Sequence, residues 1–275
     1  MNAARPTIVA LLFASAAAAQ VMPFRPDTGG ARVRPEASRL DPVVLTYIAT
    51  LLPAGGIDSA RWLGERSVQL SRTTYAGAPA WEIVETHGSG ANASVDTLIA
   101  DLSTLAPLHW GATQQLPSSG SMGVAAKVTA EFRPDSMMGV ITAPSGRRNM
   151  IQTIPVGAFV TAAQMETAFR ALPLGPGVRD SVDLLLTDVA RTVAVPATLA
   201  VTGDDRVTTT AGNYDCWVVV LATAVGQTQY WVAKTDRIVV KTSQLVPESG
   251  ALLQYTLTRI SHVGAPGAPR RRGKK

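Results

Sequence analysis

The chain has 275 residues, a single cysteine and a formal net charge of +5, which the C-terminal Arg270, Arg271, Arg272, Lys274 and Lys275 account for by themselves. A neutral domain with a basic tail excludes a nucleic-acid-binding face, because such a face needs Lys and Arg spread over the folded surface. One cysteine excludes an intramolecular disulfide, and about 240 mature residues are enough for one domain with a sizeable core.

The first nineteen residues have the layout of a secretory signal peptide. Arg5 supplies a basic start, residues 8–19 form an apolar run, and Ala17 and Ala19 offer a cleavage site just before Gln20. The run is shorter than the roughly 20 residues that a membrane-spanning helix needs. We therefore expect residues 1–19 to be removed and the mature chain to be exported, to the periplasm or beyond the cell, without a transmembrane segment.

Residues 20–38 are rich in Pro, Gly and Arg and are expected to form a flexible linker. A short helix is predicted next, because Asp41 can cap it, Pro42 suits its first position and Pro53 ends it. Its apolar residues recur at helical spacing and are Val43, Val44, Tyr47, Ile48, Leu51 and Leu52.

From Trp62 onward the dominant period is two, which is typical of strands. In the segment 80–88, Trp81 and Ile83 are predicted to face the core, with Glu82 and Glu85 on the polar side. Further strands with turn signals between them are expected at 94–101, 106–110, 124–132, 137–143, 146–154, 182–189, 193–203, 205–212, 214–222, 228–234, 237–245 and 251–261.

A second helix interrupts these strands at residues 161–172. Thr161 or Ala162 begins it and Pro173 stops it. Its buried stripe is Met165, Ala168, Phe169 and Leu172. Sequential hairpins with so few helices predict a mainly β fold: an antiparallel, strongly curved sheet or open half-barrel in a single domain, residues 39–263, with one or two short helices that plug its concave side.

The C-terminal residues 264–275 contain no apolar side chain larger than Ala or Pro and are expected to be disordered. The basic tail either stays solvated or adheres to an anionic envelope surface. Both interpretations remain open at this point.

The aromatic residues are concentrated in the later strands. Both faces of the segment 214–221 are apolar, so this strand should be central, with cover on each side. The cover is either a packed core or an apolar, lipid-like ligand in an open barrel. If a cavity exists, the residues expected to form its wall are Tyr214, Trp217, Tyr230, Trp231 and Tyr255, whereas Cys216 is expected to be a buried hydrophobe.

The segment 211–260 resembles the C-terminal half of an exported bacterial family, domain of unknown function 3108. The resemblance is carried by Gly212, Tyr214, Cys216, the Tyr230-Trp231-Val232 strand, the polar turn 234–237, Lys241 and Gly250, and it extends over most of residues 61–261. Val239 stands where the family pattern usually has Pro. The resemblance implies a mostly β, exported protein, with kinship to the lipoprotein-carrier (LolA/LolB-like) half-barrels, and it supplies no catalytic residues.

Short matches to catalytic and metal-binding motifs do not predict a site. Asp27-Thr28-Gly29 lies in the Pro-rich linker and has no second copy to share a proton with. Gly203-Asp204-Asp205 is interpreted as a tight turn between two strands. His87, His109 and His262 never fall at metal-ligand spacing. We therefore predict no catalytic residue, no metal site and no cofactor.

Three functional hypotheses follow. The first is an exported, non-enzymatic β-rich domain that binds an apolar or amphipathic ligand or an envelope partner. The second is a structural envelope protein with an adhesive basic tail. The third and weakest is an exported hydrolase, which would require His87 or His109 to meet a serine and a carboxylate in one pocket.

Overall fold

In the computed structural model the described residues are 35–54, 60–88, 93–116, 124–187, 192–224, 226–247 and 249–262. The predicted signal peptide and the basic tail lie outside them, as does most of the predicted linker. The final residues of that linker belong to the domain, because Ala37 is fully buried in the short 3-10 helix η1 (Ala37–Arg39) and its N–H donates to the Ser103 carbonyl.

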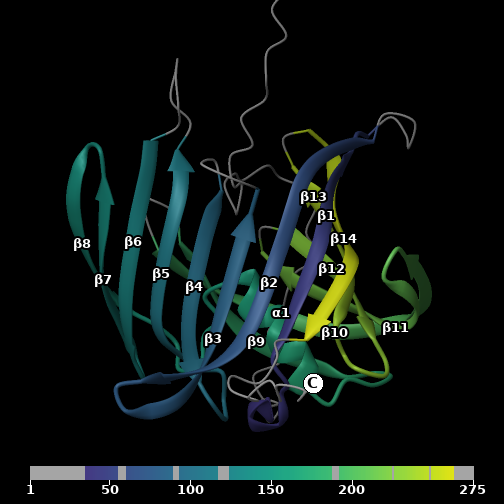
Figure 1. Ribbon diagram of the computed structural model, residues 1–275, viewed down its shortest axis with the longest axis horizontal. Coiled ribbons are helices and arrows are strands. Elements are labelled where there is room, and N and C mark those ends of the chain that lie inside the picture. Colours follow the sequence, from purple (N-terminus) through teal and green to yellow (C-terminus); the bar gives the residue numbers. More distant parts are fainter. Residues whose placement is uncertain are drawn as a thin grey trace, which may run out of the picture.

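One antiparallel sheet contains all fourteen strands of the described residues (Figure 1). The strands are β1 (Val43–Leu52), β2 (Arg61–Tyr75), β3 (Ala78–His87), β4 (Ser94–Asp101), β5 (Pro107–Leu116), β6 (Val124–Arg133), β7 (Ser136–Ala143), β8 (Gly146–Thr153), β9 (Arg179–Thr187), β10 (Thr192–Thr209), β11 (Gly212–Thr223), β12 (Gly226–Ala233), β13 (Val239–Val246) and β14 (Ala251–His262). Their spatial order runs from β8 down to β1, continues with β14 and ends at β9. The pairing of β1 with β14 therefore joins the two halves of the meander in the middle of the sheet, and β8 and β9 form the two edges.

The sheet curves strongly, so that its two ends approach each other without pairing. Figure 1 shows β2 to β8 as one wall, with β9 to β12 crossing behind it. Near the seam, Met150 of β8 and Leu185 of β9 belong to the same apolar cluster. The mainly β prediction with an open half-barrel is confirmed.

The helix predicted at residues 43–52 is wrong, because this segment is the strand β1. Its side chains alternate instead of forming a stripe: Val43, Leu45 and Tyr47 are buried on the concave face. β1 pairs with β2 on one edge and with β14 on the other. Val44 and Ile48, on its other face, are also apolar and half-buried, so apolar residues stand on both faces and mimic helical spacing. The β-branched Val44, Thr46 and Ile48 suit the strand better than a helix, and pairing on both edges decides the outcome.

The second predicted helix is confirmed as α1 (Ala162–Ala171). The Thr161 side chain caps it by accepting a 3.0 Å hydrogen bond from the backbone N–H of Gln164, and Pro173 follows the last turn. α1 lies inside the curve of the sheet (Figure 1), and eight of its residues are buried. Among the described residues, no helix has the length and apolarity to cross a bilayer.

The tight turn predicted at Gly203-Asp204-Asp205 is also wrong, because these residues lie within β10. The register with β11 shifts between Val201 and Gly203, which is the signature of a β-bulge. The strand bends there and continues. Lys234 contacts the Asp204 carboxylate at 2.7 Å, and the Trp231 indole N–H donates to Asp205, so both carboxylates have structural partners.

Two hairpins are confirmed, one between the strands predicted at 137–143 and 146–154 and one around the polar turn 234–237. Pro144 and Ser145 connect β7 to β8, and residues 234–238 connect β12 to β13. Arg237 has a positive φ of 55° in the second turn, and its guanidinium donates to the Leu172 carbonyl at the C-cap of α1. This turn therefore fixes one end of the helix.

The two apolar faces of β11 are both covered, as its sequence predicted. Val219 and Leu221 pack in the smaller apolar cluster with Phe169 of α1, while Cys216 and Val218 belong to the larger cluster. Burial, followed by the charge of Asp205, raises the pKa of the Cys216 thiol to about 12. Cys216 is thus a buried hydrophobe and not a reactive thiolate.

Candidate functional site

The five aromatic residues expected to form a cavity wall do not lie on one surface. Tyr230 faces α1, and its ring meets Phe169 edge-on at 4.9 Å between centroids. Trp231 faces the other way, with Lys241 above its ring. Trp217 is half-buried against the smaller cluster and Tyr214 against the larger one.

Tyr255 is the member of that set whose ring borders a cluster of charges. The Arg66 guanidinium lies 5.1 Å from its ring centroid, and the His87 ring meets it edge-on at 6.1 Å. Tyr47, on the adjacent strand β1, lies 5.3 Å from the same guanidinium and donates its hydroxyl to the Val239 carbonyl. Two tyrosine rings therefore flank one buried cation.

That cation belongs to a group that we call the concave polar cluster: Arg66 of β2, Glu85 and His87 of β3, Asp96 of β4, and Glu166 of α1. The strand register places Arg66 opposite His87 and Glu85 opposite Asp96. Residues directly opposite one another in neighbouring antiparallel strands share a face of the sheet. The four strand residues consequently face the interior, toward α1.

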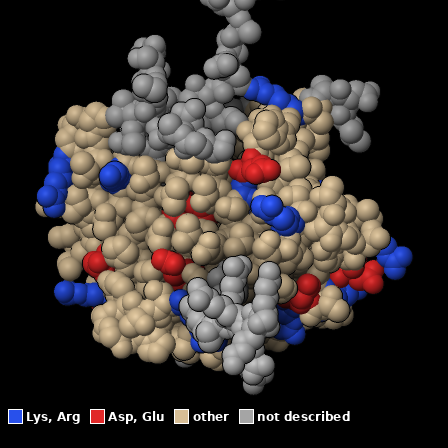
Figure 2. All heavy atoms as spheres, in the orientation of Figure 1, with Lys and Arg blue, Asp and Glu red and all other residues tan. Residues whose placement is uncertain are grey.

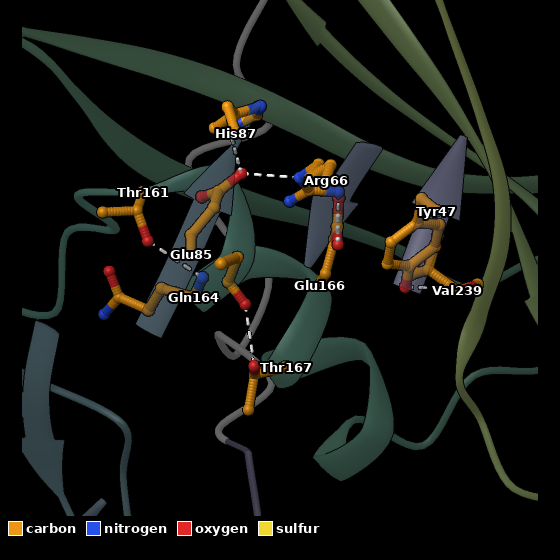
Figure 3. Close-up of polar contacts among 10 residues, drawn as sticks. Tyr47, Arg66, Glu85, His87, Thr161, Gln164, Glu166, Thr167 and Val239 are labelled. Atoms are coloured by element: carbon orange, nitrogen blue, oxygen red, sulfur yellow. Dashed lines mark hydrogen bonds and ion pairs between the residues drawn. The ribbon is translucent and has the colours of Figure 1, made fainter. Parts of the chain in front are cut away.

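Arg66 holds the cluster together (Figure 3). Its Nε donates to Glu85 Oε1 at 2.6 Å, and its Nη1 donates to both oxygens of Glu166, at 2.8 and 3.0 Å. His87 Nε2 lies 2.8 Å from the same Glu85 oxygen. Arg66 is 2% exposed and Glu166 5%, whereas the His87 side chain is 33% exposed. The cluster is therefore sealed beside α1 and open toward His87.

Burial and charge act in opposite directions on the two glutamates. Burial opposes ionisation of Glu85, but the charges of Arg66 and His87 prevail and hold the pKa of that carboxyl well below its usual range. For Glu166, burial and the neighbouring Glu85 prevail over Arg66 and raise the pKa. Despite its burial, the pKa of Arg66 is raised by the two glutamates. Glu85 and Arg66 thus form the permanently charged pair, and of the two glutamates Glu166 is the one that protonates more readily.

Asp96 differs from both glutamates because no cation compensates it. Burial, followed by the charge of Glu85, raises its pKa from 3.8 to about 7, and His87 offsets only part of this. Its Oδ1 atom is buried without a protein hydrogen-bond partner. This carboxyl therefore keeps its proton to a much higher pH than an exposed aspartate does.

The concave face of β2 to β5 is layered in polarity. The row nearest the end of the sheet where β3 ends and β4 begins, which we call the upper end, holds Arg66, His87 and Ser94, and the next row holds Glu85 and Asp96. The row below is apolar and consists of Leu70, Ile83, Leu98 and Trp110. Charge therefore lies at the upper end of the concave face, and large apolar side chains lie deeper.

Small hollows remain on both sides of α1. One, of about 10 Å³, lies between α1 and strands β1 and β2, beside Glu166 and Arg170. The other, of the same size, lies between the residues that follow α1 and β10. Each has room for roughly one water molecule, so at these places α1 fills the concavity.

The described residues show little that resembles catalytic machinery. Among them, no group of three or more His, Cys, Asp or Glu side chains could hold a metal ion. His109 contacts Glu131 at 2.7 Å, and Tyr75 donates to the same carboxylate, but this trio is on the exposed side of the sheet. Within the described ranges, neither His87 nor His109 makes a hydrogen bond to a serine, as the hydrolase hypothesis requires.

The concave polar cluster did not emerge from sequence reasoning. Placing Glu85 on the polar side of β3 together with Glu82 is wrong: Trp81, Ile83, Glu85 and His87 share the inward face. Their spacing of two residues was the available signal. It was missed because an inward carboxylate is unexpected unless its cation, here Arg66 on another strand, is already known.

Charge is sparse on the face of the molecule that is turned toward the viewer in Figure 1. Figure 2 shows isolated Lys, Arg, Asp and Glu side chains separated by broad uncharged areas on the face of Figure 1. This view shows no continuous basic stripe of the kind that a nucleic-acid backbone requires.

The curved fourteen-stranded sheet with α1 on its concave face defines a β-barrel-like domain. The chain belongs to the family described as "Protein of unknown function (DUF3108)", which it matches over residues 59–257. A search of curated proteins finds no match.

Two solved structures are similar to this chain. One is a β-barrel-like protein of domain of unknown function DUF1849 from Brucella abortus, with a TM-score of 0.51 and 11% sequence identity, covering 82% of this chain and 100% of that one. The other is a Bacteroides fragilis protein with a YmcC-like fold, with a TM-score of 0.34 and 13% identity, covering 84% of this chain and 100% of that one. The first supports the barrel-like fold.

Proposed function

We propose that the protein is an exported, non-enzymatic domain that binds an amphipathic ligand on the concave face of its half-barrel. The observation that carries the proposal is the layering of this face, on which Arg66, Glu85 and Asp96 lie above the apolar row of Ile83 and Trp110. An amphipathic molecule has the same order of polarity, so its head would meet the concave polar cluster while its tail lies deeper.

The composition of the cluster supports a binding role over a purely structural one. Buried ion pairs seldom stabilise a fold better than well-packed apolar residues of the same size, because the desolvation penalty offsets their attraction. Arg66, Glu85 and Glu166 are nonetheless more than nine-tenths buried on a face that is otherwise rich in apolar side chains. Fold stability alone gives little reason to keep three charged groups there.

The ligand's tail can bind only if α1 is displaced, because the helix fills the space beside the apolar rows. Besides the apolar packing of Met165 and Phe169, α1 makes three polar contacts that can exchange partners: Glu166 with Arg66, Gln164 with the Leu105 carbonyl, and Arg237 with the Leu172 carbonyl. Of these, the Glu166 contact joins the helix directly to the charged row.

A fluorescent probe tests the binding function. The purified protein should bind the apolar dye N-phenyl-1-naphthylamine saturably, and amphiphiles with a single alkyl chain should displace it. Glu166→Gln weakens the contact between α1 and Arg66 and should tighten probe binding several-fold. Glu82→Gln, on the opposite face of the same sheet, is the matched control. If the dye fails to bind the wild type and Glu166→Gln alike, the ligand-binding proposal is wrong.

Export is tested separately. When the full chain is expressed in a bacterium with its own leader, the purified protein should begin at Gln20 and should be released with the periplasmic or extracellular fraction. Intact residues 1–19 on a protein recovered from the cytoplasm would contradict the export part of the proposal and leave the binding part to its own experiment.

A further inference from the structure

Three buried polar atoms on the concave face of β2 to β5 have no hydrogen-bond partner among the described residues: Arg66 Nη2, Asp96 Oδ1 and Trp110 Nε1. Trp110 is only 3% exposed, and its Nε1 is the one polar atom of its side chain. A buried polar atom without a partner destabilises a fold by about 1–3 kcal/mol, and native proteins rarely tolerate several of them together. Two of these atoms donate hydrogen bonds and one accepts.

The register fixes the order of the two atoms on β4 and β5. Asp96 pairs with Ala112, and Trp110, two residues away on β5, pairs with Leu98. Trp110 therefore lies one row deeper than Asp96, a step of roughly 6–7 Å along the strands. An acceptor near the upper end of the barrel is followed, toward the apolar rows, by a donor.

Charge decides which kind of head group fits beside Asp96. Arg66 already shares its single positive charge with Glu85 and Glu166, at 2.6 and 2.8 Å. With Asp96 included, three carboxyl groups face one guanidinium, and the half-exposed His87 is the remaining base of the cluster. An anionic head would be repelled here, whereas an ammonium ion would supply both the missing charge and the missing donor.

We propose, on the basis of the proposed function, that the ligand is an amphiphile whose head carries a primary ammonium group, followed toward the tail by phosphate or ester oxygens. The ammonium group donates to Asp96, and the oxygens accept from Trp110 Nε1, one row deeper. The acyl chain continues past Ile83 and Leu98 into the space that α1 occupies in this structure. This arrangement satisfies the unpaired atoms of Asp96 and Trp110 with one molecule.

Two lysophospholipids with the same acyl chain separate this proposal from its alternatives. Lysophosphatidylethanolamine carries the ammonium group, and lysophosphatidylglycerol has a hydroxylated head without it. Displacement of N-phenyl-1-naphthylamine below the critical micelle concentrations should show that the wild type prefers the ethanolamine lipid by about tenfold.

Substitutions test whether the lipid preference depends on the Asp96 carboxylate and whether lipid binding depends on the Trp110 N–H. Asp96→Asn keeps the shape but loses the charge, and it should abolish the preference; Asp135→Asn, in the exposed β6–β7 turn, should preserve it. Trp110→Phe keeps a ring but loses the N–H, and it should weaken both lipids several-fold; Trp62→Phe, on an exposed tryptophan, should weaken neither. Far-ultraviolet circular dichroism establishes that each variant is folded.

The pH dependence supplies a second readout. Asp96 faces Glu85 and His87 of β3, Arg66 of β2 and Glu166 of α1, and its carboxyl gains charge as the pH rises through about 7. The preference for the ethanolamine lipid should therefore grow severalfold between pH 6 and pH 8.5 in the wild type and stay constant in Asp96→Asn.

The outcomes distinguish this inference from the proposed function. If both lipids displace the dye equally well, or if Asp96→Asn keeps the preference, the head-group assignment is wrong, although the face still binds amphiphiles. The unpaired atoms of Asp96 and Trp110 would then be satisfied by water alone. If neither lipid displaces the dye and the dye itself does not bind, the proposed function fails first.

Discussion

Arg66 is the residue on which the interior charges depend. Its guanidinium joins β2 to β3 through Glu85 and to α1 through Glu166, while the rings of Tyr47 and Tyr255 lie beside it. Removing the cation would leave Glu85 buried, charged and uncompensated. The stability of the fold is therefore more sensitive to breaking this cluster than to replacing it as a whole.

Arg66→Met should lower the free energy of unfolding by about 3–5 kcal/mol, because it leaves two buried carboxyl groups without their cation. The triple variant Arg66→Met/Glu85→Leu/Glu166→Leu should recover most of this loss in urea titrations. The matched control is Arg206→Met, which breaks an ion pair with Asp215 in which both side chains are more than half exposed, and it should change stability by less than about 1 kcal/mol. A triple variant as unstable as Arg66→Met would show that the cluster is structural.

Asp96 gives the stability a pH dependence of opposite sign to that of an ordinary ion-paired carboxylate. Its pKa rises from 3.8 to about 7 on folding, so its contribution to stability is fully present below about pH 4 and is lost as the pH rises through 7. Asp96→Asn removes this loss. Relative to the wild type, the variant should gain on the order of 2 kcal/mol between pH 5 and pH 9.

Urea midpoints at the two pH values measure this difference, and Asp135→Asn again serves as the control because its side chain is exposed. A difference between Asp96→Asn and the wild type that is the same at pH 5 and pH 9 would mean that the carboxyl titrates normally in the folded protein.

At the scale of elements, local sequence signals decided some segments and long-range pairing decided others. α1 was predictable because Thr161 caps it and Pro173 ends it within its own sequence. The hairpins were predictable for the same reason, since their turns lie between the strands that they join. β1 was not, because its pairing with β2 and with β14, some two hundred residues later, overrides its helical spacing.

The candidate site was harder to predict than the fold. Its members come from β2, β3, β4 and α1. Successive strands were expected to pair, but the sequence shows neither their register nor that α1 packs against them. Of the five aromatic residues expected to form a cavity wall, Tyr255 borders the cluster, while Tyr230 and Trp231 diverge because neighbours in a strand point to opposite faces. A spacing argument places residues on a face, but it cannot say which side chains of other strands meet them there.

The cap of α1 gives a prediction at this scale. Thr161→Ala removes the side-chain acceptor of the Gln164 N–H and should lower the free energy of unfolding by about 1 kcal/mol. Because α1 covers the apolar rows, the same variant should also take up N-phenyl-1-naphthylamine more readily. Thr235→Ala, in the exposed β12–β13 turn, should change neither. Unchanged dye binding in a destabilised Thr161→Ala would indicate that the helix stays in place when the ligand enters.

At the scale of the whole molecule, the first and last strands hold the domain together. β1 and β14 are adjacent in the middle of the sheet, and each joins one half of the meander to the other. Leu257 of β14 is fully buried beside Tyr47 of β1. β14 is thus the last strand of the described residues, and its pairing with β1 joins the two halves of the sheet.

Deleting residues 264–275 tests whether the basic tail contributes to stability and whether it adheres to an anionic surface. The truncated protein should unfold at the same urea concentration as the full chain, because the last residue of β14 is His262.

The full chain should sediment with vesicles that contain phosphatidylglycerol at low salt and lose this binding at high salt. The five basic residues of the tail carry a charge of +5, and salt screens their attraction to an anionic surface beyond a Debye length of about 10 Å. The truncated protein should not bind at either salt concentration. If salt-sensitive binding survives the deletion, the vesicles bind to the barrel and not to the tail. If the truncated protein is less stable, the tail packs on the sheet.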